Sequence, residues 1–123
     1  MNEQFFKSII DQDKMQIVVC NLEHTIVYMN PAADEAYKKH GGHALVGKSI
    51  FDCHTAPTNE LIKDVVVWFA KSKENNLVHT FYNERLNKDV YMVALRNSDG
   101  ELIGYYEKHE PRNRDESPFY VLD

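Results

Sequence analysis

The alternation of hydrophobic and polar residues predicts both helices and strands in this chain. Residues 3–12 place four apolar side chains at helical spacing: Phe5, Phe6, Ile9 and Ile10. A helix this short is not stable alone, so we expect it to dock on its own domain or on a partner. Residues 16–20 and 25–29 are rich in β-branched residues, and the turn residues at 21–24 predict that they form a hairpin.

Two helices are predicted after the hairpin. Asn30 is a favourable N-cap for a helix that runs from residue 32 to about residue 40, before a pair of glycines. Thr58 is the predicted cap of a longer helix over residues 59–72. Its apolar residues cover a broad face, so we expect this longer helix to be largely buried.

Three further strands complete the pattern, over residues 77–86, 90–96 and 101–109. The last two are joined by Asn97-Ser98-Asp99-Gly100, a strong hairpin signal. Strands in separate runs that flank helices are typical of an α+β fold with one antiparallel sheet. We therefore predict an α+β fold whose helices pack on one face of the sheet.

This pattern divides the chain into three parts. Residues 1–13 form the N-terminal amphipathic helix, residues 14–110 form one domain, and residues 111–123 form a polar tail. The tail ends in an apolar cluster at residues 119–122 that could dock back or engage a partner.

Composition narrows the function classes. The chain has 123 residues, a net charge of -5 and only short basic pairs, so nucleic acid and anionic membranes are poor partners. Its longest apolar runs are far below the roughly 20 residues that span a bilayer. No secretion signal is visible, and the two cysteines Cys20 and Cys53 are too few for a disulfide scaffold. We expect free thiols and a cytoplasmic location.

Three segments in this order resemble a PAS domain. They are Ile26-Val-Tyr-Met-Asn-Pro-Ala-Ala33, the turn Gly47-Lys-Ser-Ile-Phe51, and residues 90–104, which end in Asp-Gly-Glu-Leu-Ile-Gly. The likeness covers residues 14–110, and the Asp52-Cys53-His54 triplet resembles a branch of small bacterial PAS domains. The resemblance implies a five-stranded antiparallel sheet around a small-molecule cavity, and signalling by an N-terminal helix that pairs with a second copy. The chain departs from the common pattern at residues 21–24, which lack the usual glycine.

The triplet Asp52-Cys53-His54 contains side chains that serve as nucleophiles, bases and metal ligands. Adjacent side chains on an extended segment point in opposite directions, so Cys53 and His54 are poorly placed as a nucleophile–base pair. A base would have to come from another element, such as His79 or His109. No histidine or cysteine spacing matches a zinc site. We therefore predict a pocket wall, with no catalytic residue, no metal site and no enzymatic activity.

Haem is the alternative ligand, because it needs only one axial imidazole in an apolar cavity. Haem-binding PAS domains usually take this ligand from the long helix, which contains no histidine here. His54 and His79 are the residues that could substitute. This alternative corresponds to a gas or redox sensor.

Strand alternation provides the remaining candidates. It predicts Leu77, His79 and Phe81 on one face of their strand, and Val78, Thr80 and Tyr82 on the other. So many phenols and imidazoles suit a cavity for a small polar-aromatic molecule. Eight ligand-binding residues are predicted: Phe51, Cys53, His54, Trp68, His79, Phe81, Met92 and Tyr106. The predicted function is a sensory, ligand-binding module that forms a homodimer through residues 3–12 and signals to a protein partner.

Overall fold

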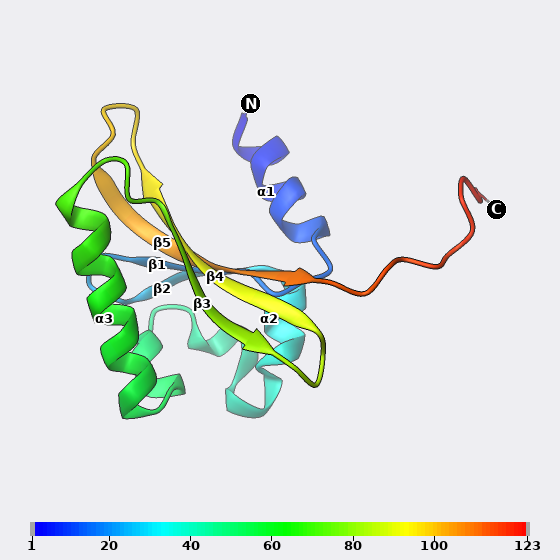
Figure 1. Cartoon of the computed structure of the whole chain (residues 1–123), viewed down its shortest axis with the longest axis horizontal. Coiled ribbons are helices and arrows are strands. Elements are labelled where there is room, and N and C mark those ends of the chain that lie inside the picture. Colours follow the sequence, from blue (N-terminus) through cyan, green and yellow to red (C-terminus); the bar gives the residue numbers. More distant parts are fainter. Residues whose placement is uncertain (1, 123) are drawn as a thin grey trace.

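The computed structural model describes residues 2–122 and contains one five-stranded antiparallel sheet (Figure 1). The strands are β1 Val18–Asn21, β2 Ile26–Met29, β3 Leu77–Asn83, β4 Lys88–Arg96 and β5 Leu102–Pro111. Their order across the sheet is β2-β1-β5-β4-β3, and every neighbouring pair is antiparallel. The predicted α+β class and the five-stranded sheet are confirmed.

The helices are α1 Asn2–Gln12, α2 Pro31–Ala36 and α3 Ala56–Lys71, with short 3-10 turns at Lys38–His40, Gly42–Leu45 and Ile50–Cys53. Asn30 caps α2 as predicted, but the α-helical part ends at Ala36 and continues as a 3-10 turn. The α3 helix begins at Ala56, three residues before the predicted start. Pro57 is tolerated there because the first turn of a helix needs no backbone donor.

Only one face of α3 is buried, so the prediction of a largely buried helix is wrong. Ile62, Val65 and Phe69 belong to the core, whereas Leu61, Val67 and Trp68 are exposed. The spacing of the buried residues is that of a single helical stripe. One stripe suffices because α3 packs against β4 and β5 and has no second layer on its other side.

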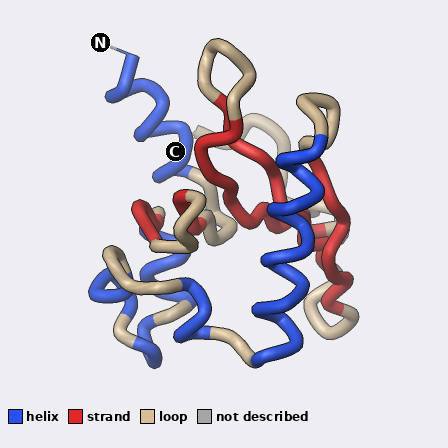
Figure 2. The backbone as a smooth tube through the Cα atoms, turned by 90° about the vertical axis from the view of Figure 1, so that its left-hand side faces the viewer, coloured by secondary structure: helices blue, strands red, loops and turns tan. Residues whose placement is uncertain are grey.

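The sheet separates α2 from α1. In Figure 1, α2 lies below the sheet and α1 projects above it, and Figure 2 shows α3 in front of the strands. We call the face toward α2 and α3 the inner face and the opposite face the outer face. The prediction that helices pack on one face therefore holds for α2 and α3.

The end of the sheet strand β5 is tied to the turn between β3 and β4. Arg112 Nε donates to Asp89 Oδ2 over 2.7 Å, and its backbone amide donates to the Asn87 carbonyl. The chain then leads away from the sheet (Figure 1). The side chains of the apolar cluster at residues 119–122 are all exposed.

Gly104 sits where β5 passes close to β1. A Cβ atom added at this glycine would lie 2.3 Å from the carbonyl oxygen of Cys20, a distance that real Cβ atoms do not reach. The close approach lets β5 pair with β1 through Asn21 and with β4 through Leu95. Glycine is therefore required here by contact with a neighbouring backbone.

Asn30 connects the N-terminal segment to α2. Its side chain is fully buried, and its Oδ1 accepts hydrogen bonds of 2.9 Å from the amides of Ile17 and Ala33. Its Nδ2 donates over 3.0 Å to the carbonyls of Ile10 and Met15. One amide side chain thus holds the end of α1, the linker before β1 and the first turn of α2.

We predict that Asn30→Asp lowers the free energy of unfolding by about 3 kcal/mol, because a buried carboxylate would face two carbonyl oxygens without a donor. The measurement is chemical denaturation, with amide hydrogen exchange to follow α1. Asn113→Asp is the control, since the exposed Asn113 only accepts a bond from Asn87 and a carboxylate can still accept it. An Asn30→Asp protein as stable as this control would contradict the assignment.

Candidate ligand-binding site

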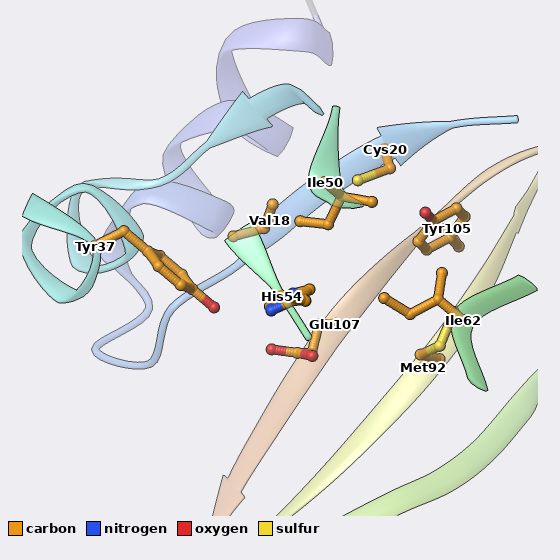
Figure 3. A pocket seen from close by; sticks show the side chains of 9 residues that line it. All are labelled: Val18, Cys20, Tyr37, Ile50, His54, Ile62, Met92, Tyr105 and Glu107. Atoms are coloured by element: carbon orange, nitrogen blue, oxygen red, sulfur yellow. The ribbon is translucent and has the colours of Figure 1, made fainter. Parts of the chain in front are cut away.

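A small space lies between the inner face and the helices, and we call it the inner cavity. Its volume is about 20 Å³, room for about one water molecule. Figure 3 shows Tyr37, His54 and Glu107 turned toward it from three different elements. The residues that line the inner cavity are Val18, Cys20, Tyr37, Ile50, His54, Ile62, Met92, Tyr105 and Glu107.

Burial keeps the two phenols and the Cys20 thiol around the inner cavity protonated. It raises the pKa of both phenols, Tyr37 and Tyr105, well above the usual value. It also raises the pKa of the Cys20 thiol to about 11. The Tyr105 hydroxyl is hydrogen bonded to His24 Nδ1 at 2.7 Å. The cavity therefore presents neutral hydroxyl and thiol groups, with Glu107 as its carboxylic residue.

A wider and more open space, which we call the groove, lies beside the inner cavity between α3 and strands β3 to β5. Its volume of about 440 Å³ is within the range of small-molecule pockets. The groove is lined by Gln16, Thr58, Leu61, Ile62, Thr80, Phe81, Asn83, Lys88, Val90, Met92, Glu107 and His109. It shares Ile62, Met92 and Glu107 with the inner cavity, so the two spaces are neighbours across these side chains.

A β-bulge determines which side chains of β3 reach the groove. His79 pairs with Tyr91, whereas Phe81 pairs with Val90, and the register shifts between them at Thr80. Directly paired residues share a face, so His79 lies on the outer face and Phe81 on the inner face. The predicted strict alternation, which placed His79 and Phe81 together, is wrong because the bulge inserts one extra residue.

Cys53 and His54 have different surroundings, as expected for neighbours in sequence. Cys53 lines a small space of about 10 Å³ among core residues, and His54 lines the inner cavity. Burial and the neighbouring Asp52 raise the pKa of the Cys53 thiol, which disfavours the thiolate needed for nucleophilic attack. Among residues 2–122, no group of three or more His, Cys, Asp or Glu side chains could hold a metal ion.

Of the other predicted site residues, Met92 lines both spaces and Phe81 lines the groove. Phe51 packs against the core with its ring centroid 4.6 Å from that of His24. Trp68 is 40% exposed on α3 and lines neither space. Tyr106 pairs with Val93 and lies on the outer face.

Neither histidine of the haem alternative fits a haem in this structure. His54 faces the inner cavity, which holds about one water molecule and is far smaller than a porphyrin. His79 lies on the outer face, with Nε2 2.8 Å from Asp89 Oδ1 and its ring 4.9 Å from that of Tyr91. Neither His54 nor His79 therefore presents an axial imidazole to a space of haem size.

The eight predicted ligand-binding residues leave out several side chains that line the two spaces: Tyr37, Lys88, Glu107 and His109. They also leave out His24, which contacts Tyr105 and Phe51. Strand alternation could have identified Lys88. It lies two and four residues before Val90 and Met92 on the same strand, so the three side chains must share a face. His24 adopts a positive φ of 63° at the turn that lacks the usual glycine, which places its ring beside Phe51. The other contacts depend on which strands become neighbours.

None of the helices described, α1 to α3, is long and apolar enough to cross a membrane. No protein-family model matches the sequence, and no curated protein matches it significantly.

Solved structures do match the fold. The C-terminal domain of a Streptococcus mutans protein is similar over 89% of this chain and 84% of its own length, with a TM-score of 0.67 and 23% identity. The PAS domain of a Colwellia psychrerythraea protein matches over 91% of this chain and 98% of its own, with a TM-score of 0.66 and 13% identity. The PAS domain of BvgS from Bordetella pertussis matches over 92% of this chain and 88% of its own length, with a TM-score of 0.62 and 19% identity. The sheet order, the helices on its inner face and these likenesses show that this chain has the PAS fold.

Proposed function

We propose that this chain is a sensory module that binds a small molecule between its sheet and α3. The PAS folds it resembles indicate a family of sensory modules. The observation that carries the proposal is the groove of about 440 Å³, which adjoins the inner cavity and shares three lining residues with it. A molecule in the groove would contact Met92 and Glu107, which also line the inner cavity. Binding would in this way change the packing of the sheet against the helices.

The proposed module is not an enzyme. Its two cysteines are free thiols whose pKa values are raised, and a protonated thiol is a weak nucleophile. His109, named above as a residue that could supply a base for the thiol, is bonded to Glu107, with Nε2 2.9 Å from Oε1. Free thiols also support the proposed cytoplasmic location, which is a reducing compartment.

We further propose that α1 pairs with α1 of a second copy and passes the ligand state to a protein partner. Its apolar side chains Phe5, Phe6 and Ile9 are 65%, 60% and 69% exposed, and no residue of α1 is buried. The end of α1 is fastened to the domain through Asn30 and through a hydrogen bond from the Tyr28 hydroxyl to Asp11. One turn earlier, Lys7 Nζ lies 5.7 Å from the centroid of the Tyr28 ring. An amphipathic helix with an uncovered apolar face favours association with a similar face.

The ligand prediction is tested by native mass spectrometry of the freshly purified protein. We expect a bound small molecule, and we expect Leu61→Trp to reduce the bound fraction at least about fivefold by filling the groove. Val67→Trp on the same helix is the control, because Val67 is exposed and does not line the groove. Equal occupancy in both variants, or wild-type protein without ligand, would argue against a small-molecule site in the groove.

The dimer prediction is tested by light scattering. We expect a dimer for the wild type and a folded monomer for Phe5→Glu/Ile9→Glu, because paired carboxylates in an apolar interface are strongly unfavourable. Gln4→Glu/Ser8→Glu adds the same charge to the opposite side of α1 and should remain a dimer. A dimer that survives the first pair of substitutions would exclude association through α1.

A further inference from the structure

We propose that the groove selects a small carboxylate with an apolar body, and that Lys88 Nζ binds the carboxylate. This inference rests on the proposed ligand-binding function and names the chemical class of the ligand. It follows from one unusual feature, a lysine on the inner face of the sheet. Lysine is rarely buried in proteins unless its charge has a partner.

Lys88 is buried but has no partner in the protein. It is 8% exposed, at the start of β4, on the same face as Val90 and Met92. Among residues 2–122, its Nζ makes no hydrogen bond and no ion pair. The Nζ atom itself keeps some access to solvent. A largely buried lysine whose ammonium has no protein partner is unfavourable, so a bound anion would complete this part of the groove.

The charges around Lys88 leave it available to a ligand. Glu107 is the acidic residue of the groove, but its Oε1 already accepts a hydrogen bond from His109 Nε2. Burial lowers the pKa of Lys88 more than the attraction of Glu107 raises it, and the cationic Arg85 lowers it further. The attraction of Glu107 therefore does not fully offset the unfavourable burial of the charged Lys88 side chain.

His109 supports the same conclusion from the neighbouring strand. It pairs with Val90, and its side chain is 7% exposed. Its Nδ1 is buried, and no hydrogen-bond partner is found for it in the described chain. Two nitrogen atoms on adjacent strands, Lys88 Nζ and His109 Nδ1, thus lack partners beside the groove, while His109 Nε2 is bonded to Glu107. Unpartnered polar atoms are expected at a site that a polar ligand group completes.

Beside the polar Gln16, Thr58, Thr80 and Asn83, the groove has apolar side chains that determine the other part of the ligand. Leu61 from α3 and Phe81 from β3 are both exposed large side chains at the groove, and Val90 and Met92 form its floor. A hydrophobic body would cover these side chains while the carboxylate reaches Lys88. Inorganic anions and sugars lack such a body and fit the groove less well.

We predict that Lys88→Met raises the melting temperature by roughly 2–5 °C at pH 7. A lowered lysine pKa means that the folded state penalises the charged amine. This loss of folding stability is complete when the pH is below the pKa of Lys88 in the folded state. It disappears as the pH rises past 10.5, the pKa of lysine in the unfolded chain. Methionine removes the charge and keeps the length of the side chain. Lys39→Met, on an exposed lysine, is the control for net charge and should leave the melting temperature unchanged.

The binding test uses hexanoate and 3-phenylpropionate, each beside its primary amide, in amide chemical-shift titrations of the full chain. We expect the carboxylates to shift groove residues such as Thr80 and Val90 and to bind at least about tenfold more tightly than the amides. Lys88→Met should remove this preference by weakening carboxylate binding about tenfold. Lys39→Met should bind like the wild type.

The stability and binding measurements together either support the carboxylate preference or overturn it. A Lys88→Met protein that is more stable but binds carboxylates less well supports it, since a merely structural lysine would not give opposite effects. Amides that bind as tightly as carboxylates, or carboxylate affinity unchanged in Lys88→Met, would overturn the anion preference. If none of the four compounds shifts the groove residues, the inference is wrong. The sensory function then still stands if native mass spectrometry finds a ligand whose occupancy depends on Leu61.

Discussion

The fold depends on one buried amide, the side chain of Asn30. Its oxygen accepts from the amides of Ile17 and Ala33, and its nitrogen donates to the carbonyls of Ile10 and Met15. These partners belong to three segments: the end of α1, the linker before β1 and the first turn of α2. All of these hydrogen bonds are to backbone atoms. The Asn30 side chain therefore fixes the path of the backbone, and it does not depend on which side chains the partner residues carry. It sets where α1 leaves the domain and where α2 begins to cover the sheet.

The inner face of the sheet has an apolar half and a polar half, and the candidate site lies at their boundary. Cys20 and Tyr105 are buried in the apolar half, whereas Lys88, Glu107 and His109 lie in the polar half. A sheet face built only for stability would place apolar residues at all five positions. Side chains that reduce stability at such positions are typical of functional sites. The polar half is therefore the part of the molecule where the proposed ligand binding would be in conflict with stability.

Parts of the site followed from sequence and parts did not, for different reasons. Met92 was predicted correctly as an inward residue because β4 alternates regularly, and the same regularity applied to Lys88 would have identified it. His79 was assigned to the face of Phe81 because a one-residue bulge leaves no clear mark in the sequence of β3. Trp68 was predicted as a ligand-binding residue on a largely buried helix, but it is 40% exposed. Helical periodicity shows which residues share a stripe but not how wide a stripe is covered.

By itself, the sequence determined the elements and their class: the hairpin, the Asn30 cap, the three later strands and the α+β order. These depend on local spacing and turn chemistry, which act between residues close in the chain. Only the tertiary structure decided that β5 lies between β1 and β4, which brings Glu107 and His109 beside Lys88. That pairing joins residues far apart in sequence, and local patterns carry no information on which distant strands become neighbours. The charge left unpaired in the groove is a consequence of this long-range arrangement.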